Sequence, residues 1–242
     1  VIGFSDPKAT SSSKGETLKD TIKMVTSKIG FLKKRIKGVT CYVSDYEARM
    51  THVSARPRIL FITRLWDPAE PVVQTDSELV RQWGEINEMR MLLVRKLRAT
   101  FPEQFIGGIQ DSPYAQTQCP DLILSEHSTW KRIYLHRMKH SEICIASTGL
   151  HQSSGWKIAE YLAAGRAIVS EPLCYEVPGP FQAGKNYLTY HSAEDCIGQI
   201  QTLLTHPEQI LQMGQLNRSY YDEWLRPDRL VEKALQQAGI FL

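Results

Sequence analysis

Apolar and polar residues along this chain alternate in blocks whose lengths predict strands and helices. Four short, continuous apolar runs have the pattern of strands buried in a parallel sheet; they cover residues 58–63, 105–109, 143–147 and 167–169. Longer stretches carry apolar residues three or four positions apart, as helices do; they cover 78–100, 128–140 and 156–164. This alternation indicates an α/β fold with a parallel sheet and helices on both faces.

The connections and the C-terminal part complete this pattern. Residues 110–127 contain two prolines and predict a loop, long enough to be functional. A second loop, rich in proline and glycine, precedes a predicted strand over 186–190. Ser192 and Pro207 each predict the start of a helix, the first as a cap and the second as a first-turn proline. A last helix is expected over 227–238.

The N-terminal part differs from the rest in charge. Residues 1–58 carry twelve Lys or Arg and five Asp or Glu, a net charge of +7, whereas the remainder carries 17 and 21, a net charge of −4. Residues 17–36 have an apolar stripe at helical spacing, with most basic residues off that stripe. This is typical of a helix packed on a domain with a solvated basic back. It also fits a helix at an anionic membrane surface, a peripheral membrane contact.

A domain boundary is expected at residue 57, where a proline precedes the first buried strand. Residues 1–56 would then be a basic N-terminal segment, and residues 57–242 would form the sheet domain. The first residues, VIGFSDP, include no initiator Met and match no signal peptide pattern. We expect the chain to be a fragment of a longer protein.

Composition excludes several classes of function. Hydrophobic residues make up 42% and charged residues 23%, as in soluble globular proteins, and no apolar run approaches the roughly 18 residues of a membrane span. No nucleic-acid-binding motif accompanies the basic segment, so no nucleic-acid partner is expected. The five cysteines are widely spaced and form no Cys-x-x-Cys pair, which suggests neither a disulfide framework nor a zinc site. A reducing cytoplasm fits best, and we expect no metal.

The stretch 147–170, STGLHQSSGWKIAEYLAAGRAIVS, carries the candidate chemistry. A polar loop leads from a strand into a short helix, whose first turn presents unpaired backbone N–H groups and the positive end of the helix dipole. Such a junction binds anions and suits phosphate. Gly155 would let a phosphate approach the backbone because it has no Cβ. Glu160 lies in the second turn and would face the same crevice. The candidate binding residues of this stretch are Gln152, Ser153, Ser154, Gly155, Trp156, Lys157 and Glu160.

This stretch resembles the nucleotide-sugar-binding segment of the group-1 glycosyltransferases, which have two Rossmann-like domains (the GT-B fold). In that family two carboxylates, with seven residues between them, bracket a glycine-containing loop and helix start. The second carboxylate falls on Glu160, which is followed by a Tyr-Leu-Ala-Ala-Gly run and an apolar strand, as in the family. The first falls on Gln152, a departure from the pattern. An amide can bind sugar hydroxyls but supplies no negative charge.

The resemblance extends to the end of the first strand. The family often has a Gly-Arg-Leu turn there, with a lysine five residues after the arginine. Arg64 and Leu65 match, whereas Thr63 replaces the glycine and Ala69 replaces the lysine. Part of the expected diphosphate clamp must therefore come from elsewhere. Lys157 is one candidate, although a solvent-facing Lys157 is an equally good interpretation.

The resemblance, which covers roughly residues 57–238, implies the donor-binding half of a glycosyltransferase. Its substrate would be a nucleotide diphosphate-sugar, with no separate cofactor, and its acceptor a glycan or lipid-linked molecule in glycan or surface polysaccharide synthesis. Arg64 and the helix start would stabilise the leaving diphosphate, Glu160 would bind ribose hydroxyls, and Gln152 would contact the sugar. No catalytic base can be named, because the opposing domain usually contributes it in this fold. The expected location is the cytoplasm, or the inner face of the membrane.

Two alternatives remain open at this stage. A sugar-nucleotide epimerase shares the fold and also binds a nucleotide-sugar. A non-catalytic module of the same fold would bind a partner or a membrane through residues 17–36, and the departures at Gln152 and Ala69 favour it a little.

Overall fold

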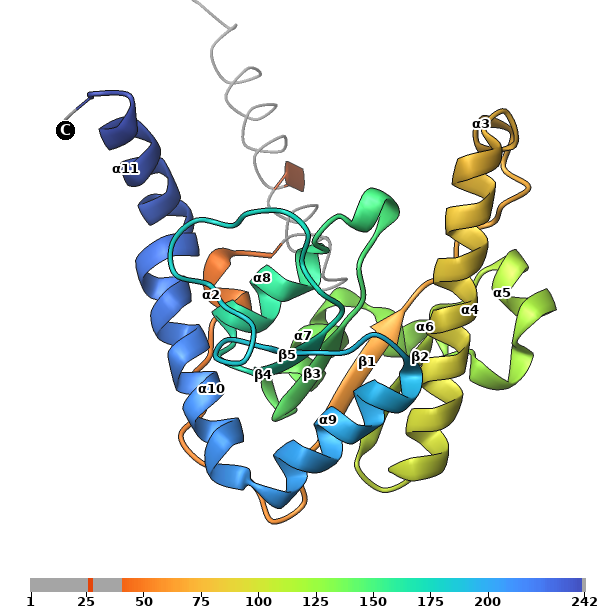
Figure 1. Cartoon of the computed structure of the whole chain (residues 1–242), viewed down its shortest axis with the longest axis horizontal. Helices are drawn as coiled ribbons and strands as arrows, with labels where there is room; N and C mark the ends of the chain where they lie inside the picture. The colour runs from red at the N-terminus through yellow and green to blue at the C-terminus, as the bar shows by residue number, and fades with distance from the viewer. Residues whose placement is uncertain (1–25, 28–40, 241–242) are drawn as a thin grey trace, which may run out of the picture. The chain divides into compact units, whose positions relative to one another are not determined.

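The computed structural model describes residues 26–27 and 41–240 (Figure 1). The predicted helix over 17–36 lies outside the described residues, apart from the helical positions 26 and 27. The sheet belongs to a compact unit that begins at Tyr42, and this unit is described here by itself. Among the described helices, none combines the length and the apolar content that a membrane span requires.

The described part of the chain forms one five-stranded parallel sheet in the order β2-β1-β3-β4-β5 (Figure 1). The strands are β1 (Ile59–Thr63), β2 (Phe105–Ile109), β3 (Ile143–Ala146), β4 (Ala167–Ser170) and β5 (Leu188–Thr189). The α/β prediction is confirmed, and each predicted strand is present within two residues of its expected ends. Every residue of β1, β3 and β4 is buried, which explains why these segments are continuous apolar runs rather than alternating ones.

Helices connect the strands and cover the sheet. They are α2 (Val43–Tyr46), α3 (Pro71–Gln74), α4 (Ser77–Thr100), α5 (Pro113–Gln118), α6 (Glu126–Thr129), α7 (Lys131–Lys139), α8 (Trp156–Ala163), α9 (Ala193–Thr205), α10 (Pro207–Tyr220) and α11 (Pro227–Gln237). Short helical turns lie at η1 (Pro120–Leu122), η2 (Leu150–Gln152) and η3 (Tyr221–Leu225). The predicted helix starts hold, since Ser192 caps α9 and Pro207 opens α10.

One face of the sheet packs against α4, α9 and α10. Successive strand residues point to opposite faces, so alternate residues such as Phe61 and Ile145 share a core with Leu93 and Leu97 of α4 and Ile200 of α9. Helix α8 contacts β3 and β4 and contributes a buried apolar side of its own. The sheet is therefore covered on both faces, and the carboxyl ends of its strands are the places where ligands can reach it.

Two sequence interpretations need correction. Residues 110–127 are not one long loop, because Ser112 caps a helix that Pro113 opens, and α5 and η1 occupy half of the segment. The helix expected over 128–140 is interrupted at Trp130, whose extended backbone separates α6 from α7.

The compact unit also begins earlier than the boundary predicted at residue 57. The Ala48 N–H donates to the Ala163 carbonyl at 3.1 Å, and Met50 belongs to the core. Residues 42–56 are therefore packed onto the sheet unit. That residues 1–56 derive from an acceptor domain stays a prediction.

Candidate active site

The order in which strands are added to the sheet reverses between β1 and β3. The chain places β2 on one side of β1 and the later strands, from β3 on, on the other side. Ligands of open α/β sheets bind at such a point, in the crevice at the carboxyl ends of the strands. Here β1 and β3 pair only through Ile59–Ile143 and Leu60–Cys144, so no pairing joins their carboxyl ends. The fold thus forms a crevice between the segments that follow β1 and β3.

A cavity of about 560 Å³ lies at this point. It is lined by the ends of β1 and β3, the loop before α8, the first turns of α7 and α8, and one residue of α4. Seven of the eight predicted binding residues line it, and they are Arg64, Ser153, Ser154, Gly155, Trp156, Lys157 and Glu160. Arg64 and Ser153, which are 89 positions apart in the chain, therefore line the same cavity.

The N-terminus of α8 opens into this cavity. Gly155 is the N-cap residue, and no side chain of the described residues caps the first turn. The unpaired N–H groups of that turn and the helix dipole favour an anion at this point. Trp156 begins the helix and is 89% exposed, at the edge of the cavity.

Lys157 turns back toward the sheet rather than into solvent. Its Nζ donates to the carbonyl of Ile62, near the carboxyl end of β1. Burial, and next the positive charge of Arg90, lower the pKa of Lys157 to about 7, while the charge of Glu160 acts in the opposite direction. The solvent-facing interpretation of Lys157 is therefore wrong, and its amine is available within the cavity.

Arg90 joins the two sides of the crevice, and sequence reasoning did not find it. Its guanidinium donates to the Arg64 carbonyl at 2.9 Å on the β1 side. On the β3 side it donates to Ser147 Oγ and to the Thr148 carbonyl, each at 3.3 Å. Burial lowers its pKa to about 10. The sequence does carry one indication that Arg90 is buried. It lies between Ile86 and Leu93 in the inward-facing stripe of α4.

Arg64 completes a cluster of three cations. Its side chain is exposed at the end of β1, with the guanidinium carbon 5.9 Å from the centre of the Trp66 ring. Arg90 lies 4.6 Å from the same ring. Among the described residues, no carboxylate forms an ion pair with Arg64, Arg90 or Lys157. Three such charges in one cavity, beside a helix N-terminus, favour a ligand that carries several negative charges.

Glu160 is the only acidic residue that lines this cavity among the described residues. One carboxylate oxygen accepts from Lys131 Nζ at 2.5 Å and the other from the Tyr134 hydroxyl at 2.7 Å. Burial lowers the pKa of Lys131. The hydrogen bond to Glu160 and the charge of Glu160 outweigh this effect, so the pKa of Lys131 is raised. Both donors come from the first turns of α7, and neither was predicted from the sequence.

Gln152 does not line the same cavity as the other predicted residues. It lines a neighbouring cavity of about 320 Å³, together with residues of α4, and Gly149 is shared by both. His151 and Gln152 have positive φ angles of 52° and 56°, which turn the loop. The Cys174 thiol donates to Gln152 Oε1 at 2.6 Å, so the loop after β4 lies against this turn.

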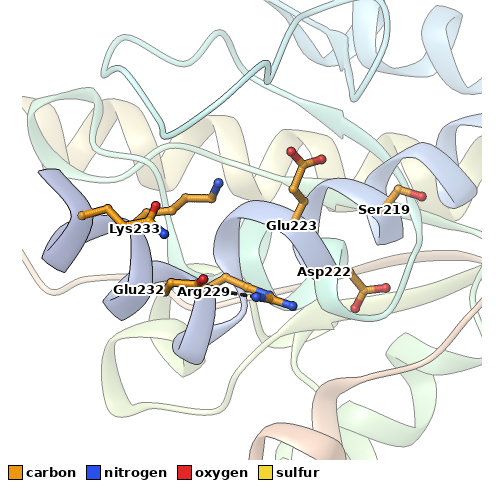
Figure 2. Close-up of a pocket in the computed structure, with 7 residues that line it drawn as sticks. Ser219, Asp222, Glu223, Arg229, Glu232 and Lys233 are labelled. Atoms are coloured by element: carbon orange, nitrogen blue, oxygen red, sulfur yellow. Dashed lines mark hydrogen bonds and ion pairs between the residues drawn. The ribbon is translucent and has the colours of Figure 1, made fainter. Parts of the chain in front are cut away.

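A separate groove lies between η3 and α11 (Figure 2). Figure 2 shows Asp222 and Glu223 pointing to different sides of their helix, while Arg229 is paired with Glu232. Asp222 is paired with Arg218 and Arg49. Because most of its charges already have partners, this groove is a weaker ligand site than the crevice between β1 and β3.

Comparison with known proteins identifies the family. Residues 91–228, more than half of the chain, match the family described as glycosyl transferase-like. The solved structure of TarM superposes with a TM-score of 0.50 and 13% identity, over 79% of this chain and 36% of TarM, and shows the same fold. The C-terminal domain of LpcC, a group-1 glycosyl transferase from Francisella tularensis, has a TM-score of 0.48 and 10% identity, over 76% of this chain and 97% of that domain.

A short match to a different protein was also found. The aspartate carbamoyltransferase catalytic subunit of Bacteroides thetaiotaomicron is 60% identical over 47 residues. These residues are 19% of this chain and 15% of that protein, too little to indicate a shared activity. The family match covers far more of the chain and confirms the resemblance seen around Glu160. This chain belongs to the glycosyl transferase-like family.

Proposed function

We propose that this chain is the donor-binding part of a glycosyltransferase and that the crevice between β1 and β3 holds a nucleotide diphosphate-sugar. The observation that carries the proposal is the cluster of Arg64, Arg90 and Lys157 beside the N-terminus of α8. A diphosphate is the part of such a donor that needs several cationic donors and backbone N–H groups.

The remaining groups of the donor are assigned to the two ends of the cavity. Glu160, next to α7, would accept hydrogen bonds from the ribose hydroxyls. The sugar would lie toward Gly149, at the border with the cavity that Gln152 lines. Because Gln152 is neutral, its proposed role is limited to hydrogen bonding with the sugar.

In the proposed reaction, the bond between the sugar's anomeric carbon and the diphosphate breaks while an acceptor hydroxyl forms a new bond to that carbon. Negative charge then develops on the diphosphate, and cations already in place stabilise it without reorganisation. The proton of the acceptor hydroxyl would pass to a base outside this chain. We propose a glycan or lipid-linked acceptor in polysaccharide synthesis, at the cytoplasmic face of a membrane.

The proposal is tested by a thermal-shift screen of this chain against UDP, GDP, CMP and ADP and their common sugar conjugates. A ligand at 100 times its dissociation constant adds about 2.7 kcal/mol of stability. One nucleotide is expected to raise the melting temperature, with the shift lost in Glu160→Ala and reduced in Arg64→Ala. A folded chain that responds to none of these ligands would contradict the proposal.

Donor binding is expected to weaken as the pH rises above 7. The charged form of Lys157 binds the diphosphate, and with a pKa of about 7 this form predominates in the free protein only below that pH. Because the bound anion favours the charged form, binding above pH 7 requires proton uptake, and the affinity falls by up to about tenfold per pH unit. Calorimetric titrations at pH 6, 7, 8 and 9 measure the trend. Lys157→Arg, which stays charged, is expected to remove it.

A non-catalytic binding module is the second candidate, and the position of Gln152 favours it. Where the family has a carboxylate, this chain has an amide that lies outside the donor cavity. The two functions are distinguished by incubating the full-length protein, with its donor bound, in the presence of an acceptor. Release of free nucleotide in the presence of acceptor would support the transferase, and binding without turnover would support the module.

A further inference from the structure

The side chain of Glu160 is held by two donors at once, which fixes the orientation of its carboxylate. A carboxylate has about four lone-pair sites, two on each oxygen. Lys131 occupies one site on one oxygen and Tyr134 occupies one site on the other. Among the described residues no other hydrogen bond to the Glu160 carboxylate is formed, so each oxygen keeps an acceptor site for a ligand in the cavity that Glu160 lines. Two neighbouring hydroxyl groups can donate to such a pair together.

The two donors are themselves held in place. Lys131 Nζ lies 4.8 Å from the centre of the Tyr46 ring and 5.0 Å from that of Tyr134. The side chains of Lys131 and Glu160 are 32% and 17% exposed, and Tyr134 is buried. Burial raises the pKa of the Tyr134 hydroxyl well above its ordinary value, so this group stays protonated and continues to donate.

The ion pair also makes a carboxylate compatible with this ligand. Glu160 lines the same cavity as the N-terminus of α8, where the diphosphate is proposed to bind. An unpaired carboxylate would repel that diphosphate. Lys131 offsets the negative charge of Glu160 and leaves its free acceptor sites unblocked.

We infer that Lys131 and Tyr134 are positioning residues, which orient Glu160 toward a cis-diol and make the site select ribonucleotides over 2′-deoxyribonucleotides. This inference rests on the proposed function. A 2′-deoxy ligand would leave one of the two acceptor sites unfilled. A lost hydrogen bond to a charged group corresponds to about a tenfold loss of affinity or more.

Calorimetry with matched pairs of probes tests this selectivity: UDP and dUDP, GDP and dGDP, ADP and dADP. For the nucleotide that binds, the wild-type chain is expected to prefer the ribo form by about tenfold or more. Tyr134→Phe and Lys131→Met are expected to reduce this ratio to less than about threefold. Lys131→Met, which leaves the Glu160 carboxylate without its cation, is expected to weaken both forms as well. Lys131→Arg is expected to restore most of it. Arg132→Met, an exposed position on the same helix, is the control and should retain the wild-type ratio.

The outcomes separate the inference from the proposed function. Equal affinity of the wild-type chain for the ribo and deoxy forms would overturn the selectivity while leaving the diphosphate site intact. A strong preference for ribo that Tyr134→Phe and Lys131→Met both retain would overturn the positioning roles. A folded chain that binds none of the six nucleotides would overturn the proposed function and this inference with it.

Discussion

Replacing Lys157 with methionine is expected to weaken binding of the nucleotide diphosphate-sugar by about 30-fold or more at pH 6.5. At that pH the amine carries a charge in most molecules, since its pKa is about 7. A buried charge that pairs with the ligand is typically worth about 2–5 kcal/mol when removed. Calorimetric titration of both proteins with the donor identified in the thermal-shift screen measures this effect.

The stability of the free protein shows whether such a loss reflects the site or the fold. The Lys157 amine is desolvated and donates only to the Ile62 carbonyl among the described residues. Methionine is of similar length and carries no charge to desolvate, so the free variant is expected to melt at the wild-type temperature or above it. Lys185→Met, at an exposed position outside the cavity, should bind normally. Unchanged binding in Lys157→Met would exclude this lysine from the diphosphate site.

Replacing Gly107 with alanine is expected to destabilise the fold by about 3 kcal/mol or more. Gly107 pairs with Phe61 of β1, and a Cβ added there would lie 2.0 Å from the Phe61 carbonyl oxygen and 2.6 Å from the end of the Phe105 ring. To relieve this clash, the backbones of the two paired strands β1 and β2 would have to move apart. This places the change among the strongly destabilising substitutions. Urea denaturation followed by circular dichroism measures the change in the free energy of unfolding.

Gly84→Ala is the matched control for this substitution. Gly84 lies inside α4, and a Cβ there would meet no atom within 4 Å. Because alanine has the higher helix propensity, the control is expected to gain up to about 1 kcal/mol. Equal effects of the two substitutions would contradict the close packing of β2 against β1.

Much of the fold could be predicted because its signals are local. The apolar runs at β1 and β3 are continuous, and the positions of Ser192 and Pro207 mark helix starts without reference to any distant residue. The helix α5 was missed, and α6 was merged with α7 into one predicted helix, because they are only six and four residues long, too short for a periodic pattern to develop.

The candidate site could be predicted in part, for a related reason. The carboxyl ends of parallel strands meet at one edge of a sheet, so Arg64 and the loop before α8 were expected to converge. The position of Arg90 in the site depends on how far the carboxyl ends of β1 and β3 lie apart. No local sequence pattern predicts this separation. Gln152 departs from the cavity because two consecutive residues adopt positive φ angles without being glycine, a choice that the sequence does not signal.

A crystal structure of this chain with its tightest-binding nucleotide diphosphate-sugar tests the central claim most directly. The diphosphate is expected to lie at the N-terminus of α8, within hydrogen-bonding distance of Lys157 Nζ, with the ribose hydroxyls on Glu160. A nucleotide bound elsewhere, such as in the groove between η3 and α11, with the crevice between β1 and β3 empty, would contradict it.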